Sequence, residues 1–363
     1  MHCYGIVGLP NVGKSTLFNA LTHSSVLAEK YPFSTTDHHI GVVKVPDERL
    51  KRLAELVEAI EVKPTTIEFV DIAGLVKGAH KGEGLGNRFL SYIREVDCIV
   101  EVVRLFRDET ISHISTDLEP ISDIETINLE LIFKDLETIS KRRDKLCQLL
   151  RTSKEKRYQE EWELLGQAEA CLNEGRLASS LRLLPSEGGY LKELSLLTAK
   201  PFLYVANIDE EDLGKGNQLL KEIEGMAKET GARVVNLSAK LEDELKDLPK
   251  EEADEFRQEM GMVSGINALI AESYSLLDLI SFFTVEHRKV SSWTLKRGMS
   301  AQEAAGKIHS DMEKGFISAE VVPFYQLIEV GSLSSASKKG LIRQEGREYV
   351  VQDGDVITFR FNV

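Results

Sequence analysis

The segment Gly8–Ser15 constrains the fold of this chain most strongly. It reads G-L-P-N-V-G-K-S and matches every fixed position of the phosphate-binding loop G-x-x-x-x-G-K-S. An apolar run, Tyr4–Val7, precedes it and a helical pattern, Ser15–Leu21, follows it, which is the context that the motif requires. In such a loop backbone N–H groups surround the phosphates, Lys14 adds a positive charge, and the Ser15 hydroxyl is a ligand of Mg²⁺.

The apolar runs that follow alternate with helical patterns. A helix is expected over Glu48–Ile60. Further buried strands are expected at Gly41–Val45, Ile67–Val70, Ile99–Val103, Phe202–Ala206 and Arg233–Leu237. Alternating strands and helices are typical of a mostly parallel sheet covered by helices. The predicted fold class is therefore α/β, with the doubly wound sheet of a P-loop NTPase.

A long helical pattern interrupts this sheet between residues 124 and 195. Apolar side chains, with one arginine among them, recur there at steps of three and four residues: Leu129, Ile132, Leu136, Ile139, Arg143, Leu146 and Leu150. A second helix on the same scheme contains Tyr158, Leu165, Ala168 and Leu172. Two such helices predict an inserted antiparallel coiled-coil arm. Ordinary helices packed on the main core are the alternative.

The C-terminal residues have the pattern of a small α+β module. Trp293–Leu295, Ile317–Val322 and Val356–Val363 are expected to be strands. Ser300 and Glu303 form a capping-box pattern that opens a helix between the first two. The predicted domains are an NTPase domain (residues 1–123 and 196–278), a helical insertion (124–195) and a C-terminal module (279–363).

Composition excludes several classes of protein. The 363 residues are 42% hydrophobic and 29% charged, which excludes a disordered tail and a collagen-like chain. The sequence has neither a run of ~18 apolar residues nor a secretory signal at its start. We therefore expect a cytoplasmic protein that does not associate with a membrane. A monomer is also expected. Its four cysteines are not spaced as metal ligands and are expected to be reduced.

The net charge of −14 does not favour nucleic acid, but a total can hide a basic region. Residues 134–157, toward the tip of the predicted arm, contain four acidic side chains and nine basic ones. The basic residues are Lys134, Lys141, Arg142, Arg143, Lys145, Arg151, Lys154, Lys156 and Arg157. They are either a solvated helix face or a contact with a polyanion such as RNA, whose binding would weaken steeply with salt.

A second motif, D-I-A-G at Asp71–Gly74, directly follows a predicted strand. In switch NTPases the aspartate of such a motif holds Mg²⁺, usually through water, and the glycine N–H senses the γ-phosphate. A threonine between this motif and the phosphate loop is expected to complete the Mg²⁺ shell, and Thr35 is preferred over Thr36. The predicted metal site is therefore Ser15, Thr35 and Asp71.

The base-reading motif differs from that of guanine-specific proteins. Their N-K-x-D is replaced by Asn207-Ile208-Asp209-Glu210, with Ile208 at the lysine position and Glu210 at the aspartate position. A glutamate is one methylene too long for the carboxylate that accepts from two N–H groups of guanine. Because such polar sites discriminate by ~10⁴ or more, guanine preference should weaken sharply. Ser238-Ala239-Lys240 matches the S-A-K element that lines a base pocket.

The residue after the D-x-x-G glycine is Leu75, where classical small GTPases place a glutamine that orients the attacking water. Leucine cannot hydrogen-bond a water, so slow intrinsic hydrolysis is expected unless another group acts. His113 is a candidate catalytic residue, although a single loop histidine is more often only solvated. A nucleotide-binding scaffold with negligible turnover therefore remains an alternative.

Taken together, these residues resemble the Obg-like P-loop ATPases of the YchF type, essentially from end to end. The similarity includes G-L-P-N-V-G-K-S-T-L-F-N-A-L-T, Y-P-F-x-T, D-I-A-G-L-V-K-G-A-H-K-G-E-G-L-G-N-R-F-L, N-I-D-E, S-A-K and V-Q-D-G-D-V-I-T-F-R-F-N-V. The C-terminal module is similar to a TGS domain, which is a β-grasp module. His38-His39 depart from the usual Pro-Asn of the family, and Arg104-Leu105-Phe106 from a pattern that often ends in Cys-Phe.

The resemblance implies an ATP-preferring hydrolase that binds the ribosome, both the 70S particle and the large subunit. It implies Mg²⁺ contacts from Ser15 and Thr35, and a K⁺-associated role for Asn11. The implied ATP contacts are Asn11, Val12, Gly13, Lys14, Ser15, Thr16 and Ile208. A GTPase remains an alternative, and so does a small-molecule kinase, although the N-x-x-E element is not expected in a kinase.

Overall fold

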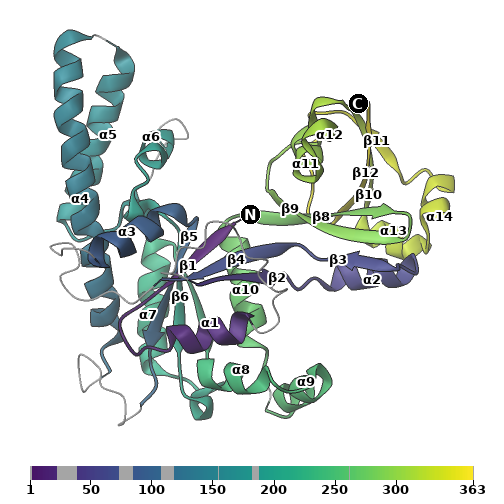
Figure 1. Ribbon diagram of the computed structural model, residues 1–363, viewed down its shortest axis with the longest axis horizontal. Coiled ribbons are helices and arrows are strands. Elements are labelled where there is room, and N and C mark those ends of the chain that lie inside the picture. The colour runs from purple at the N-terminus through teal and green to yellow at the C-terminus, as the bar shows by residue number, and fades with distance from the viewer. Residues whose placement is uncertain are drawn as a thin grey trace. The chain divides into compact units, whose positions relative to one another are not determined.

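The computed structural model describes residues 2–22, 39–72, 85–107, 118–153, 155–181, 188–260 and 262–362. The chain forms two compact units (Figure 1). Unit 1 is Met1–Val42 with Glu68–Leu269, and unit 2 is Val43–Ile67 with Ile270–Val363. This division differs from the predicted boundaries, which place all of residues 1–123 in the NTPase domain.

The sheet of the NTPase fold has the strand order β2-β4-β1-β5-β6-β7. Its strands are β1 (Cys3–Val7), β2 (His39–Lys44), β4 (Thr66–Asp71), β5 (Cys98–Arg104), β6 (Phe202–Asn207) and β7 (Arg233–Leu237). The pairs from β4 through β1, β5 and β6 to β7 are parallel. All residues of β5 and β6 are buried, as in central strands with both faces covered. The predicted α/β class is confirmed.

Helices connect these strands. They are α1 (Lys14–Thr22), α3 (Leu85–Glu95), α4 (Pro120–Thr152), α5 (Lys156–Asn173), α6 (Gly188–Glu193), α7 (Gln218–Thr230), α8 (Ala239–Leu245), α9 (Lys250–Glu259) and α10 (Gly265–Leu276). Short 3-10 turns are η2 (Ala178–Ser180), η3 (Leu197–Ala199) and η4 (Glu210–Asp212). The helix α1 packs against β1 and α8, and α4 packs against β5 and α7.

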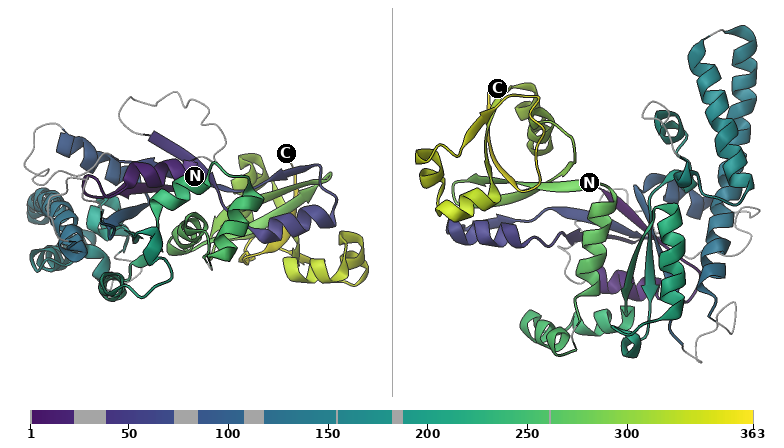
Figure 2. Two further views of the ribbon diagram at one scale, coloured as in Figure 1. Left: turned by 90° about the horizontal axis from the view of Figure 1, so that it is seen from below. Right: turned by 180° about the vertical axis from the view of Figure 1, so that it is seen from behind.

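The helices α4 and α5 lie side by side as an antiparallel hairpin, which we call the arm (Figure 2). The predicted helical pair is confirmed, and its seam contains buried apolar residues from both helices: Ile132, Ile139, Leu146, Leu165, Ala168 and Leu172. Leu129 departs from the predicted stripe, since its side chain is 46% exposed. Because α4 also packs against β5 and α7, the arm has its base on the core of unit 1.

Unit 2 contains a second sheet with the strand order β11-β10-β12-β8-β9-β3. Its strands are β3 (Glu61–Lys63), β8 (Leu279–Glu286), β9 (Lys289–Lys296), β10 (Phe316–Pro323), β11 (Arg343–Glu345) and β12 (Asp355–Phe361). Its helices are α2 (Glu48–Leu56), α11 (Ala301–Ile308), α12 (Ser310–Lys314), α13 (Phe324–Val330) and α14 (Leu333–Lys338). Both hydrogen bonds of the predicted capping box form at α11.

Residues 43–67 belong to unit 2 because their apolar side chains pack there. Leu50 and Leu53 of α2 are buried in one cluster with Phe283 and Phe324. The helix ends at Leu56, before the predicted Ile60, because Glu58 adopts a left-handed φ of 47°. The Ile60 N–H then donates to the Arg288 carbonyl (2.8 Å), which leads into the pairing of β3 with β9.

In the part of the chain that the structure describes, no helix combines the length and apolar character needed to cross a bilayer.

Candidate functional site

The phosphate loop lies between the end of β1 and the start of α1, as its sequence predicts. Two of its glycines are needed at their positions. Gly13 has a φ of 97°, and a Cβ there would collide with the Asn207 amide. Gly8 has a φ of 154°, and a Cβ there would lie 2.7 Å from the Val102 carbonyl oxygen. The loop therefore approaches its neighbours too closely for side chains at these positions.

The charged group of the loop is Lys14, whose side chain is buried. Its Nζ donates to the Leu9 carbonyl (2.7 Å), so the ammonium group is held inside the curve of the loop. Burial lowers the pKa of Lys14, while the Asp71 carboxylate counteracts this effect. The site therefore holds a partly desolvated cation at the N-terminal end of α1, where the helix dipole also favours an anion.

Two of the predicted Mg²⁺ ligands are brought together. Asp71 ends β4, beside β1, and its carboxylate is hydrogen-bonded by Ser15 at the start of α1. Burial raises the pKa of Asp71, whereas Lys14, His39 and Ser15 lower it. A carboxylate and a hydroxyl are hard oxygen donors of the kind that Mg²⁺ prefers, so these residues fit that ion.

Asn207 joins the two ends of the site through one side chain. Its Nδ2 donates to the Val12 carbonyl (2.9 Å), and its Oδ1 accepts from the Ala239 N–H (2.9 Å). The S-A-K element is thereby tied to the phosphate loop. Ser238 caps α8, since its side chain accepts from the Leu241 N–H. The buried amide thus fixes the loops that follow β1, β6 and β7 relative to one another.

These loops surround a cavity of about 950 Å³. It is lined by ten of the residues that the sequence predicts: Asn11, Gly13, Lys14, Ser15, Thr16, Asn207, Ile208, Glu210, Ser238 and Ala239. Val12 is predicted to touch nucleotide but does not line the cavity, because its side chain is buried and only its carbonyl takes part, as an acceptor for Asn207. Asp71 also lies outside the lining, although it contacts Ser15.

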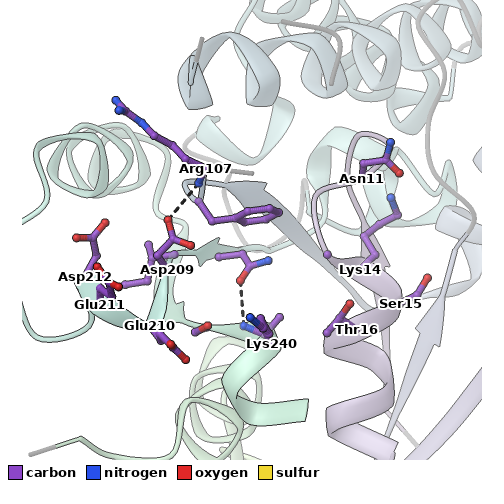
Figure 3. Close-up of a pocket in the computed structure, with 16 residues that line it drawn as sticks. Asn11, Lys14, Ser15, Thr16, Arg107, Asp209, Glu210, Glu211, Asp212 and Lys240 are labelled. Atoms are coloured by element: carbon purple, nitrogen blue, oxygen red, sulfur yellow. Dashed lines mark hydrogen bonds between the residues drawn. The ribbon is translucent and has the colours of Figure 1, made fainter. Parts of the chain in front are cut away.

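Lys240 of the S-A-K element also lines the cavity, as expected. Five further lining residues, at the end of the cavity that would hold the nucleobase, are not predicted from the sequence: Phe106, Arg107, Asp209, Glu211 and Asp212. Phe106 is held by Arg104, whose Nε donates to the Phe106 carbonyl (3.1 Å) and whose guanidinium lies 4.9 Å from the ring centre. The Arg107 N–H donates to the Asp209 carboxylate (3.1 Å; Figure 3). The signal was available, because ligands bind at the carboxyl ends of parallel strands and β5 is predicted to be one.

Thr35, His113 and Leu75 lie outside the residues that the structure describes. The predicted roles of Thr35 as a metal ligand and of His113 as a catalytic residue therefore stay predictions.

Two family models match parts of the chain. The YchF-GTPase_C family model, described as a protein of unknown function, matches residues 279–362. The MMR_HSR1 model, described as a 50S ribosome-binding GTPase, matches residues 3–135.

Full-length relatives are also found. The chain is similar to the ribosome-binding ATPase YchF of Bacillus subtilis (strain 168), with 49% identity over 362 residues and 99% of each chain covered. The same protein of Escherichia coli O157:H7 is 44% identical over 363 residues, again with 99% of each chain covered. The solved YchF GTPase of Schizosaccharomyces pombe has a TM-score of 0.87 and 36% identity, covering 99% of this chain and 97% of that one. The chain therefore belongs to the YchF family of P-loop NTPases.

Proposed function

We propose that this protein binds and hydrolyses ATP in the cavity of unit 1, with Mg²⁺, and acts as a switch on the ribosome. The single observation that supports a preference for ATP over GTP concerns the end of the cavity that would hold the nucleobase. Ile208 and Glu210 line it at the two positions where a guanine-specific protein has lysine and aspartate. Phe106 and Ile208 add apolar surface that accepts either purine.

The decisive experiment measures ATP and GTP binding on one preparation of the protein. ATP is expected to bind more tightly, because the longer Glu210 side chain misses the geometry that guanine needs. Equal or tighter binding of GTP would overturn the argument. This comparison matters because the bacterial relatives are named ATPases and the Schizosaccharomyces pombe structure is described as a GTPase.

The metal is proposed to be held by Ser15, Asp71 and Thr35, the last on the sequence argument alone. Mg²⁺ supplies charge neutralisation at the phosphates, and Lys14 adds a fixed positive charge beside it. Ser15→Ala is expected to weaken the Mg²⁺ dependence of ATP binding while leaving the ATP-to-GTP ratio unchanged. Normal Mg²⁺ dependence in this variant would contradict the assignment.

Turnover is proposed to be slow and to rise with K⁺, since Leu75 cannot orient a water and Asn11 matches a K⁺-associated asparagine of related NTPases. Phosphate release in K⁺ against Na⁺ distinguishes this ATPase from a scaffold without turnover. The K⁺ effect should disappear in Asn11→Ala. A fast rate that is indifferent to the cation would contradict the proposal.

The arm is proposed as the contact with ribosomal RNA, but most of its basic residues already have partners. Arg142 binds Glu161 and Arg143 binds Glu169 across the two helices. Four others pair with carboxylates nearby: Lys134, Lys141, Lys156 and Arg157. Among the residues that the structure describes, Lys145 and Arg151 are exposed and form no ion pair. They are therefore the arm cations most available to phosphates.

The test reverses only these two charges. Lys145→Glu with Arg151→Glu is expected to weaken co-sedimentation with ribosomes and to reduce its dependence on salt, while ATP hydrolysis by the free protein stays unchanged. The matched control is Lys221→Glu with Lys228→Glu, two exposed lysines of α7. If both double variants lose co-sedimentation with ribosomes equally, only the net charge of the protein matters. If Lys145→Glu with Arg151→Glu loses none, the arm is excluded as the electrostatic contact.

Unit 2, with the TGS-like module of residues 279–363, is proposed as a second ribosome contact. We also propose that the protein acts as a monomer in the cytoplasm, where its ribosomal partner resides. Sedimentation of the free protein tests the monomer.

A further inference from the structure

The base of the arm is tied to the start of β6 by one buried carboxylate. Asp135 lies in α4, and its side chain is fully buried. It accepts hydrogen bonds from the Leu197 N–H (3.0 Å), the Thr198 N–H (2.8 Å) and the Thr198 hydroxyl (2.6 Å). The donors belong to the short turn η3, whose first N–H groups have no acceptor within the turn itself. One side chain of the arm therefore fixes this turn.

Further hydrogen bonds at the same place connect the end of α3 to Lys200 and to α4. Lys200, directly after η3, donates from Nζ to the carbonyls of Val96 (2.5 Å) and Arg94 (3.1 Å) at the end of α3. Arg94 in turn donates to the Thr138 hydroxyl of α4 (2.9 Å). We call these contacts the arm junction: Arg94, Val96, Asp135, Thr138, Leu197, Thr198 and Lys200. It joins α3, α4 and η3 by hydrogen bonds between each pair.

Each of the three elements that meet at the arm junction continues to a region with a role in the proposed function. From η3 the chain enters β6, which ends at Asn207. Asn207 and the next residue, Ile208, both line the cavity. The helix α3 follows the D-x-x-G segment that begins at Asp71. From Asp135 the helix α4 runs to Thr152 near the arm tip, which is about 25 Å at 1.5 Å per residue. Because α4 is one continuous helix, a change in its orientation at the tip would also displace its base.

We propose that Asp135 is a positioning residue through which the arm and the nucleotide cavity change each other's affinity. A partner that holds the arm tip shifts α4, and the three hydrogen bonds of Asp135 carry that shift to η3 and β6. Since coupling between two binding sites is reciprocal, nucleotide in the cavity alters the affinity of the arm for its partner by the same factor. The inference rests on the proposed function in one respect, that the arm contacts the ribosome.

The test measures ribosome affinity with and without a non-hydrolysable ATP analogue. In the unaltered protein the two affinities are expected to differ at least about 5-fold, the lower end of ordinary coupling. Asp135→Asn keeps the size of the side chain but turns an NH₂ group toward N–H donors. The affinity ratio is therefore expected to fall to about one, although each affinity is still measurable. Thr198→Val removes only the hydroxyl bond and should give an intermediate ratio.

The control is Glu137→Gln, two residues along the same helix, where the half-exposed carboxylate pairs with Lys134 and Lys141. Its ratio should equal that of the unaltered protein. A merely structural role would lower the melting temperature of Asp135→Asn and leave the ratio unchanged, which overturns the inference. If Asp135→Asn does not fold, Thr198→Val decides in the same way.

A ratio of one in the unaltered protein also overturns the inference while leaving ribosome binding intact. Failure of the unaltered protein to bind ribosomes contradicts the proposed function instead.

Discussion

At the scale of single residues, base preference depends on two side chains that line the same end of the cavity, Ile208 and Glu210. We expect the double change Ile208→Lys with Glu210→Asp, which rebuilds N-K-x-D, to shift the ATP-to-GTP affinity ratio toward GTP by at least about 10-fold. Glu210→Asp alone should shift it less, because Ile208 still differs from the guanine motif. Nucleotide titration on one preparation measures both.

The matched control for this pair is Glu211→Asp, which shortens a neighbouring carboxylate of the lining by the same methylene. If Glu211→Asp changes the ATP-to-GTP affinity ratio by the same amount, the base preference does not depend on Ile208 and Glu210.

Another residue, Glu101 of β5, carries a carboxyl group deep in the core. It is fully buried, and burial raises its pKa well above the usual 4.5, with a further rise from Asp123. Among the described residues no cation forms an ion pair with it. The folded protein therefore keeps a proton that the unfolded chain releases, so the free energy of unfolding should fall as pH rises above 4.5.

Glu101→Gln is neutral at every pH and should remove this fall. The stability difference between the variant and the unaltered protein is expected to grow with pH by at most about 1.4 kcal/mol per unit. Urea unfolding between roughly pH 5 and pH 8 measures it. Parallel stability curves would mean that Glu101 titrates normally in the folded state.

The residues of the cavity also show what sequence reasoning reaches. Motif residues such as Lys14, Asn207 and Ala239 were found because their spacing follows from chemistry that recurs. Phe106 and Asp209 were missed, because their place depends on how the loops after β5 and β6 meet, through the Arg107 to Asp209 hydrogen bond. The contact between these two loops arises only in the folded sheet, so no motif of fixed spacing marks it in the sequence.

At the scale of elements, the arm is stabilised by a pair between its helices. Arg142 donates to both carboxylate oxygens of Glu161 (2.6 and 2.8 Å), and the Glu161 side chain is only 2% exposed. Arg142→Met should lower the free energy of unfolding by about 2 kcal/mol, because it leaves a buried carboxylate without its donor. Adding Glu161→Met should recover most of the loss, since apolar residues of similar size often replace a buried pair without cost.

Lys141→Met is the control, because Lys141 is 72% exposed and pairs only with a half-exposed Glu137. Its expected effect on urea unfolding is below about 0.5 kcal/mol. A double variant no more stable than Arg142→Met would contradict the explanation.

The helices of the arm were predicted from the sequence, whereas its ion pairs were not. The apolar periodicity of residues 129–150 predicted the helix and its seam. The charge count predicted a basic tip, but it gave no information on which cations are already paired. Arg142 and Arg143 find their partners 19 and 26 residues away, on the other helix, and only the folded hairpin brings these charges together.

At the scale of the whole molecule, unit 2 is built from two distant parts of the chain. A chain ended at the predicted boundary, residue 278, should expose Leu50 and Leu53, because their cluster includes Phe283 and Phe324. We expect this shortened protein to bind an apolar dye and to aggregate. Dye fluorescence and sedimentation measure both effects.

The control replaces residues 46–64 of the shortened protein by a short glycine-serine linker. The ends are adjacent, since the Val45 N–H donates to the Thr65 carbonyl (2.9 Å). This variant should stay monomeric and bind ATP. If the shortened protein that keeps residues 43–67 is also monomeric and binds no dye, the packing of these residues does not require the C-terminal part of unit 2.

The predicted domains missed this arrangement for a physical reason. The helix around Leu50 and Leu53 has the same amphipathic pattern whichever sheet it covers, so periodicity located the helix without assigning it to a unit. The two-part construction of unit 2 also affects biosynthesis. The strand β12, at the C-terminal end of the sequence, lies between β10 and β8 in the sheet. Residues 43–67 leave the ribosome early, but they cannot complete their packing until β8, β10 and β12 have also been synthesised, so this part of unit 2 folds later than its place in the sequence suggests.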